Sequence, residues 1–499
     1  MDTSAPPTSS QTAESAEGNI AAEIHETHTG IVALVGNRAY KVKKPVVTDF
    51  LDFRSVERRD EVCRREVLLN QRLAPDSYLG VAHLSGPQGG PPEPVIVMRR
   101  YPDARRLTSI VVGGELVLPH LSAIADVLAR FHARADRSED IDTAAKVPAV
   151  TRRWQDNLAE LRRYAGTVLS PESLADVSRL AGQFIEGREA VFAARISDHR
   201  IIDGHGDLLT GDIFCMPDGP AILDCLEFDD GLRHVDCTDD VAFLAMDLEF
   251  LGRKDLADFF IAEYQRISGD TAPTALVDFY IAYRAGVRAK VDCIRIDQGS
   301  PSAAADARHH LDIALDHLRK GTVRLILIGG GPGTGKTTLA HALAQQLSAQ
   351  VISTDDVRRE LQAHGRLGGA AGILNEGLYS SANVAAVYDA VLQRARQALA
   401  GGSSVVLDGT WRDPHLRQRA RDVASEQHCP TVELACTVPI DDAKERITQR
   451  KVTNSDATPQ IAEGLAAGGA EWPDAHLINT RQALADSVRE AQRICCSTI

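Results

Sequence analysis

The chain has 499 residues, of which 44% are hydrophobic and 25% are charged, and its formal net charge is −14. This length exceeds what a single hydrophobic core supports, so the composition indicates a globular protein of two or more domains. The negative charge disfavours sequence-independent binding to nucleic acid or anionic lipid, and no apolar run reaches the roughly 18 residues that span a membrane.

The first residues, 1–20, are rich in Ser, Thr, Ala and Pro and lack the basic start and apolar core of a signal peptide. We therefore expect a disordered tail there. The nine cysteines are odd in number and form no CxxC pair, which indicates reduced thiols rather than a disulfide framework. Together these features favour a cytoplasmic protein.

A first folded domain is predicted over 21–320. It opens with a β-hairpin whose strands are Ile31–Val35 and Ala39–Lys43 and whose turn is Gly36-Asn37. The apolar spacing then predicts further elements: a helix over 56–73, a buried strand at 95–98, mostly helix from 116 to about 190, a strand–loop–strand unit at 199–228, and helices to about 318.

Three aspartates in the strand–loop–strand unit have the spacing of a kinase-type phosphotransferase. Asp207 follows His205-Gly206, Asp212 comes five residues later, and Asp224 ends the next strand. In such enzymes the first Asp orients or deprotonates the acceptor hydroxyl, and the other two positions hold Mg²⁺ on the ATP phosphates. We expect these roles for Asp207, Asp212 and Asp224.

A phosphate-binding lysine is expected upstream of these aspartates. Lys41 and Lys43 share one strand face, and Glu66 lies in the following predicted helix. A strand lysine paired with a helix glutamate clamps the α- and β-phosphates of ATP. Lys41 is the first choice and Lys43 remains open. Either lysine alone could also be a solvated strand charge.

This constellation resembles the aminoglycoside phosphotransferase family over about 26–318, through "LARFHAR", "HGDLLTGDIF" and "ILDCLEFDD". The resemblance implies a bilobal protein-kinase-like fold and structural roles for His132 and His205. The sequence departs from the family at Asp212, where Asn is usual, and it has no glycine-rich loop. The acidic stretch from Asp224 to Glu249 is either a receptor for a cationic acceptor or a solvated face.

Composition shifts near residue 300, and we place a domain boundary near 320, so that 321–499 forms a second domain. A Walker A motif opens this domain after an apolar strand at 323–328 and before an amphipathic helix. Backbone N–H groups of the loop cradle phosphates, Lys336 reaches the β- and γ-phosphates, and the Thr337 hydroxyl ligates Mg²⁺. The expected nucleotide-binding residues are Gly330, Gly331, Pro332, Gly333, Thr334, Gly335, Lys336, Thr337 and Thr338.

Two strand-end carboxylates complete this predicted site. Asp355 and Asp408 each follow an apolar strand, and the carboxyl ends of parallel strands face the ligand crevice. Either could orient an acceptor hydroxyl or hold Mg²⁺ through water, and either could instead be a helix N-cap or turn residue. Arg446 and Arg450 are predicted to lie on a lid that closes on the phosphates, or on a solvated basic face.

Residues 322–499 resemble small P-loop kinases of the gluconate-kinase and zeta-toxin type, through the Walker loop, "STDDVRR" and "VVLDGTW". The resemblance implies a doubly wound parallel sheet. The tandem order itself resembles a bacterial family of two fused modules. We therefore expect an ATP- and Mg²⁺-dependent phosphotransferase with two nucleotide sites and a small-molecule hydroxyl acceptor. The alternative is an N-terminal pseudokinase or metabolite sensor that regulates a C-terminal P-loop kinase or ATPase.

Overall fold

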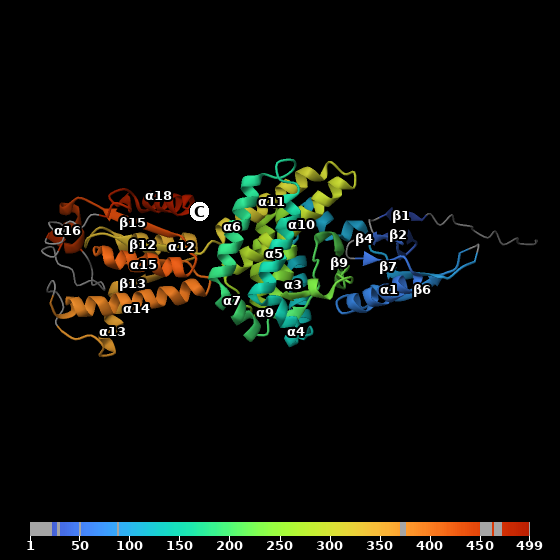
Figure 1. Cartoon of the computed structure of the whole chain (residues 1–499), viewed down its shortest axis with the longest axis horizontal. Coiled ribbons are helices and arrows are strands. Elements are labelled where there is room, and N and C mark those ends of the chain that lie inside the picture. Colours follow the sequence, from blue (N-terminus) through green and yellow to red (C-terminus); the bar gives the residue numbers. More distant parts are fainter. Residues whose placement is uncertain are drawn as a thin grey trace, which may run out of the picture. The chain divides into compact units, whose positions relative to one another are not determined.

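The computed structural model describes residues 22–26, 30–48, 51–86, 89–369, 376–449, 462–463 and 472–498. The chain divides into two compact units, of which the first comprises Met1–Ile110 and Gly211–Phe228 and the second comprises Val111–Thr210 and Asp229–Ile499 (Figure 1). The predicted tail at 1–20 lies outside the described residues. Among the helices in those ranges, none combines the length and apolarity that crossing a membrane requires. All nine cysteines are free.

The first unit is built on a five-stranded antiparallel sheet in the order β1-β2-β3-β7-β6. The predicted hairpin is confirmed, because Val35 pairs with Arg38 and leaves Gly36 and Asn37 as the turn, with Gly36 at φ +57°. The outer strands β1 and β6 were not predicted. The strands are β1 (Glu23–Glu26), β2 (Gly30–Val35), β3 (Arg38–Lys43), β6 (Tyr78–Leu84) and β7 (Glu93–Arg99), and a short pair is formed by β4 (Val47–Thr48) and β5 (Leu51–Asp52).

Helix α1 (Val56–Gln71) covers one face of this sheet, where Ser55 caps its N-terminus by accepting a hydrogen bond from the Arg58 N–H. Its buried side chains Cys63 and Val67 belong to a core that also contains Tyr78 and Ile96 of the sheet. The same core includes side chains from a two-stranded ribbon, β9 (Ile213–Met216) and β10 (Gly219–Ile222). This ribbon brings the predicted metal ligands into the first unit.

The second unit begins with a helical region, as predicted for 116–190 and for the stretch that ends near 318. Helices α8 and α10 are buried along most of their length and form its centre. The elements are α2 (Leu107–Gly113), α3 (Leu118–Arg134), α4 (Glu139–Asp142), α5 (Val147–Arg162), α6 (Pro171–Gly187), α7 (Glu189–Ser197), α8 (Cys237–Phe250), α9 (Lys254–Ser268), α10 (Thr274–Asp297) and α11 (Ala303–Lys320), with a short antiparallel pair of β8 (Ile201–Asp203) and β11 (His234–Asp236).

The P-loop region follows as a five-stranded, fully parallel sheet in the order β13-β14-β12-β15-β16, which confirms the predicted parallel α/β architecture. Helices α12 and α18 cover one face, and α14 and α15 lie on the other (Figure 1). The strands are β12 (Leu325–Gly329), β13 (Gln350–Ser353), β14 (Val405–Asp408), β15 (Thr431–Thr437) and β16 (His476–Asn479), and the helices are α12 (Lys336–Leu347), α13 (Thr354–Ala363), α14 (Ser381–Ala400), α15 (Pro414–Glu426), α16 (Ile440–Thr448) and α18 (Leu484–Ser497).

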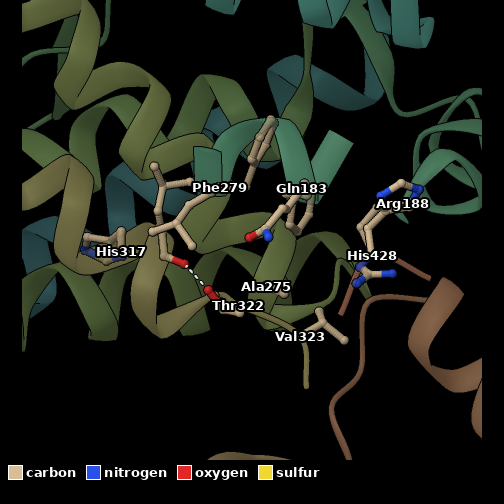
Figure 2. A pocket seen from close by; sticks show the side chains of 12 residues that line it. Gln183, Arg188, Ala275, Phe279, His317, Thr322, Val323 and His428 are labelled. Carbon is tan, nitrogen blue, oxygen red and sulfur yellow. Dashed lines mark hydrogen bonds between the residues drawn. The ribbon is translucent and has the colours of Figure 1, made fainter. Parts of the chain in front are cut away.

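Within the second unit the helical region packs tightly against the P-loop region. A Cβ atom on Gly187 would lie 2.4 Å from the Gln427 carbonyl oxygen. The Arg188 guanidinium donates to the Cys429 sulfur at 2.7 Å. A narrow cavity lies at this junction, and it is lined by Gln183 and Arg188 of the helical region and by His428 of the P-loop region (Figure 2). The predicted boundary near residue 320 falls between α11 and β12 and stays a prediction.

Candidate functional site

The P-loop between β12 and α12 depends on glycine at positions where no side chain fits. Gly330 has φ +137°, and a Cβ atom there would lie 2.7 Å from the Cys436 carbonyl oxygen. Gly333 has φ +79°, and its Cβ would lie 2.4 Å from the Ala443 carbonyl oxygen. The positive φ angles and the close backbone packing both exclude other residues. The loop conformation is therefore encoded locally, in the motif itself.

Lys336, Thr337 and Asp408 come together at the end of this loop. The Thr337 hydroxyl donates to Asp408 Oδ2 at 2.7 Å, and the Lys336 ammonium donates to the Gly331 carbonyl at 3.0 Å. Asp408 ends β14 and is buried, and its Oδ1 has no hydrogen-bond partner in the described part of the chain. Burial raises the pKa of Asp408, and Lys336 and Thr337 only partly offset that effect.

A hydroxyl beside a carboxylate with a spare oxygen is a donor set that suits Mg²⁺, which prefers hard oxygen ligands. Asp408 is not a helix cap, because α15 is capped by Asp413. Across the described ranges, no group of three or more His, Cys, Asp or Glu side chains could hold a metal. These residues thus fit a magnesium ion shared with phosphate oxygens rather than an all-protein metal site.

Asp355 lies in the first turn of α13, and the cap of that helix is Ser353. Its carboxylate pairs with Arg358, three residues later, and the Arg358 guanidinium lies 4.7 Å from the centre of the Tyr379 ring. Asp355 also contributes to the raised pKa of Asp408, although burial is the larger cause. The two predicted strand-end carboxylates are therefore electrostatic neighbours.

Arg446 on α16 reaches the P-loop backbone. It donates to the Thr480 carbonyl at 2.8 Å and to the Gly333 carbonyl at 3.5 Å. Thr480 follows β16, and its hydroxyl donates to the Thr334 carbonyl at 2.7 Å, a contact the sequence did not predict. Arg450 and the polar segment at 453–460 lie outside the described residues, so the lid stays a prediction.

In the first unit, Lys41 and Lys43 both pair with Glu66. Lys41 Nζ lies 2.8 Å from Glu66 Oε1, and Lys43 Nζ lies 2.6 Å from Glu66 Oε2. Each lysine has a second carboxylate partner: Lys41 pairs with Asp224 at 2.6 Å, and Lys43 pairs with Glu227. The lysine–glutamate pair between strand and helix that the sequence predicts is present. It involves both lysines instead of one, and Glu227 is an additional partner.

The charges in this cluster shift one another. Burial alone would raise the pKa of Glu66, but Lys41 and Lys43 outweigh it and hold that pKa below its ordinary value. Burial and the nearby Glu66 raise the pKa of Glu227. Burial would lower the pKa of Lys41, yet Asp224 and Glu66 bring it well above its ordinary value. Glu66 and Lys41 are thus a firmly ionised pair.

Asp212 and Asp224 lie at the same end of the β9–β10 ribbon. Ile213 pairs with Ile222 in the ribbon, and the Leu223 N–H donates to the Asp212 carbonyl at 3.0 Å. Asp224 has φ +65°, which is uncommon for a residue with a side chain, and its N–H donates to the Tyr78 hydroxyl at 3.1 Å. Asp212 and Asp224 therefore lie close together in the backbone at this end of the ribbon, and their role as metal ligands stays a prediction.

The loop that carries Asp207 belongs to the second unit and is held by helix α8. The His205 and Gly206 N–H groups donate to the two Asp240 oxygens at 2.8 and 2.9 Å. Thr210 donates to Asp247 from both its N–H and its hydroxyl, at 2.8 and 2.6 Å. These bonds fix the loop on both sides of Asp207, whose own N–H donates to His205 Nδ1 at 3.3 Å.

The acidic stretch of α8 corrects the sequence interpretation. Asp236, Asp239 and Asp240 are at most 3% exposed, so they form neither a solvated face nor an open receptor for a cation. Asp239 forms a two-bond pair with Arg284 at 2.7 and 3.0 Å. Asp240 accepts from the ring of His132, which is buried in a structural position as expected.

The predicted residues therefore fall into three groups. The P-loop, Asp355, Asp408 and Arg446 gather in one region, and Lys41, Glu66, Asp212 and Asp224 belong to the first unit. Asp207 belongs to the second unit. The sequence missed Lys43 as a simultaneous partner of Glu66, and it missed Glu227, Thr480 and the anchoring role of α8. An acidic residue inside an apolar helix was the one available signal, because a buried charge requires a partner.

Comparison with known proteins places the chain in a family. A family model described as an AAA domain matches residues 325–467, which contain the P-loop. The chain is 55% identical over 477 residues to "Uncharacterized protein Rv2004c" of Mycobacterium tuberculosis (strain ATCC 25618 / H37Rv) and to "Uncharacterized protein Mb2027c" of Mycobacterium bovis, with 96% of each chain covered. The chain belongs to the family of these mycobacterial proteins.

Two solved structures show more distant likenesses. A choline/ethanolamine kinase family protein from Mesorhizobium loti is 17% identical and covers 61% of this chain and 94% of its own, with a TM-score of 0.37. A gluconokinase from Sinorhizobium meliloti 1021 is 16% identical and covers 35% of this chain and 92% of its own, with a TM-score of 0.27. Likenesses of this strength say nothing about activity.

Proposed function

We propose that the chain is an ATP-dependent phosphotransferase with two nucleotide sites, each of which transfers the γ-phosphoryl group of Mg-ATP to a hydroxyl group of a small molecule. The observation that carries the proposal is the P-loop cluster, in which Thr337 donates to one oxygen of buried Asp408, and the other oxygen, beside Lys336, has no hydrogen-bond partner among the described residues. A location in the cytoplasm, where ATP and Mg²⁺ are plentiful, goes with this proposal.

In the P-loop site, the backbone N–H groups of the loop and Lys336 would bind the phosphates, and Thr337 and Asp408 would hold the metal. Magnesium, when bound, neutralises phosphate charge and orients the γ-phosphoryl group. Arg446 is already anchored on the P-loop backbone and would stabilise charge that develops during transfer.

The transfer step balances with one carboxylate as proton acceptor. The acceptor oxygen bonds to the γ-phosphorus, the bond from that phosphorus to the β–γ bridging oxygen breaks, and ADP leaves with the electron pair. The hydroxyl proton passes to a carboxylate. Asp355 is our candidate in the P-loop site, because Asp408 accepts from Thr337 and would hold the metal. Asp207 is the candidate in the N-terminal site, from its family resemblance.

The N-terminal site would take its nucleotide-binding groups from the first unit. Lys41, held by Glu66, would bind the α- and β-phosphates, and Asp212 and Asp224 would hold the metal. Asp212 also motivates the alternative of a pseudokinase or metabolite sensor that regulates the P-loop domain. In that alternative the first unit binds nucleotide or metabolite, and replacement of Asp207 leaves all phosphotransfer unchanged.

Binding stoichiometry tests the two-site proposal. A non-hydrolysable ATP analogue with Mg²⁺ should bind the wild-type chain at two sites per chain, as measured by titration calorimetry. Lys336→Ala should leave one site, and Lys41→Met added to it should leave none. A Lys336→Ala chain that still binds two analogues contradicts the P-loop assignment. A wild-type chain that binds only one contradicts the two-site proposal.

A further inference from the structure

The five charged groups around Glu66 form one continuous chain of ion pairs. It runs from Asp224 through Lys41, Glu66 and Lys43 to Glu227. The two end residues of this series of ion pairs, Asp224 and Glu227, lie in the segment after β10. They are 183 and 184 residues away in sequence from their partners on β3. These ion pairs therefore join the segment that carries Asp224 and Glu227 to the sheet and to α1.

The two ends of this chain differ in exposure. At one end Asp224 is 48% exposed and Lys41 is 16% exposed. At the other end Glu227 is 12% exposed and Lys43 is 3% exposed. Lys43 also lies 5.9 Å from the centre of the buried Phe53 ring. A ligand with phosphate groups can thus reach Lys41 and Asp224, whereas Lys43 and Glu227 are enclosed by the protein.

We propose that Lys43 and Glu227 are a positioning pair for the N-terminal nucleotide site, which keeps Glu66 engaged so that Lys41 can turn its charge to the phosphates. This inference rests on the proposed function of that site. It assigns Lys41 as the phosphate lysine, the choice that the sequence left open. Neither Lys43 nor Glu227 touches the nucleotide.

The physical reason is the sharing of one carboxylate between two cations. When Asp224 binds metal, Lys41 loses that partner and has only Glu66 and the phosphates to interact with. If Glu66 had no other cation, it would hold Lys41 tightly, because an ion pair in a buried setting is strong. Lys43 takes half of that interaction, and Glu227 balances the charge of Lys43. Lys41 is then held in place without being neutralised.

A merely structural pair would behave differently. Exchange of a buried ion pair for neutral groups is often close to neutral for stability. The double variant Lys43→Met/Glu227→Gln also leaves the net charge of the site unchanged, so a general change in electrostatic attraction cannot alter ATP affinity. Weaker ATP binding in a stable double variant therefore reports the positioning of Lys41 by Lys43.

The experiment uses the full chain with Lys336→Ala, which silences the P-loop site, and measures Mg-ATP affinity by calorimetry and the thermal midpoint by calorimetric scanning. We expect Lys41→Met to raise the Kd by about 100-fold and Lys43→Met/Glu227→Gln to raise it by about 5- to 10-fold. The matched control is Arg59→Met/Glu93→Gln, which removes a separate ion pair, between α1 and β7, that does not touch Lys41. The control should keep the parent's Kd.

The outcomes are distinct. Parent-like ATP affinity in the double variant, together with a large loss in Lys41→Met, overturns the positioning role alone. Parent-like affinity in Lys41→Met removes the N-terminal nucleotide site and takes this inference with it. Should the double variant fail to fold, the milder pair Lys43→Gln/Glu227→Gln decides, because it also leaves the net charge of the site unchanged. It should raise the Kd by about 5- to 10-fold, and a parent-like affinity overturns the inference.

Discussion

Replacement of Asp408 by Asn distinguishes the effect of this carboxylate on the stability of the fold from its role in nucleotide binding. Asp408 is 4% exposed, one of its oxygens accepts from Thr337, and the other has no partner in the described part of the chain. Burial raises its pKa, so the charged carboxylate is less favourable in the native state than in the unfolded chain. An asparagine keeps the Thr337 hydrogen bond and removes the buried charge. We therefore expect Asp408→Asn to be more stable than the wild type without metal.

The size of the expected stabilisation follows from the cost of burying Asp408 Oδ1. An unsatisfied buried polar group costs about 1–3 kcal/mol, and a charged group costs more than a neutral amide. For a cooperative unit larger than 150 residues, each kcal/mol shifts the thermal midpoint by roughly 2–4 °C. A rise of a few degrees is expected near neutral pH. The difference should shrink as pH falls through the native pKa, because the wild-type carboxyl then takes up a proton and loses its charge.

The assay is calorimetric scanning of both proteins in chelator, followed by the same scan with Mg-ATP, in a Lys41→Met background that silences the N-terminal site. Mg-ATP should stabilise the parent and fail to stabilise Asp408→Asn, and P-loop turnover should fall by about 100-fold or more. Asp422→Asn is the control, since Asp422 is exposed on α15 and accepts a hydrogen bond from Gln418. An Asp408→Asn chain that melts lower without metal, or keeps its Mg-ATP stabilisation, refutes this reasoning.

Four further outcomes are expected. Asp207→Asn should cut acceptor phosphorylation in the Lys336→Ala chain by about 100-fold with ATP affinity retained, and unchanged turnover would favour the pseudokinase alternative. Asp212→Asn should require more Mg²⁺ for half-maximal ATP binding in an Mg²⁺ series, and an unchanged requirement would mean that Asp212 is not a ligand. Burial alone would lower the pKa of His317, but hydrogen bonds to Asp278 and Glu249 outweigh burial and raise that pKa. In thermal scans the stability of the wild type should therefore fall as pH rises through the native pKa, and His317→Gln should not show this fall. In a calorimetric titration of the wild-type chain with Mg-ATP, the P-loop site should fill first, and simultaneous filling would contradict that order.

Local sequence patterns predicted the features whose cause is local. The Walker loop requires glycine at Gly330 and Gly333 because of their φ angles and their close backbone neighbours, and both requirements are written in the motif. The Gly36-Asn37 turn likewise determines the register of its hairpin. Strand β6 escaped prediction because half of it is polar or exposed at a sheet edge, where the apolar signal is weak.

Long-range partners could not be predicted in the same way. Glu227 lies 184 residues from Lys43 in sequence, and no local spacing links them. The aspartates of α8 have their partners on α3, α10 and the loop of His205 and Gly206, so their burial depends on tertiary packing. Composition alone describes such a stretch as an acidic face. The better signal is the apolar run that follows Asp240, since a charge on a buried helix must be paired.

The two candidate sites present their carboxylates in opposite states. Within the described ranges one oxygen of Asp408 has no hydrogen-bond partner, so a metal can bind it without breaking an ion pair. Asp224 instead pairs with Lys41 through Oδ1 at 2.6 Å, so a metal that binds this oxygen displaces the lysine. The displaced Lys41 keeps Glu66 and gains a phosphate in place of Asp224 when the nucleotide binds. We therefore expect metal binding and nucleotide binding to be coupled in the first unit. The P-loop site carries no such exchange cost, and this difference is the reason to expect that it fills first.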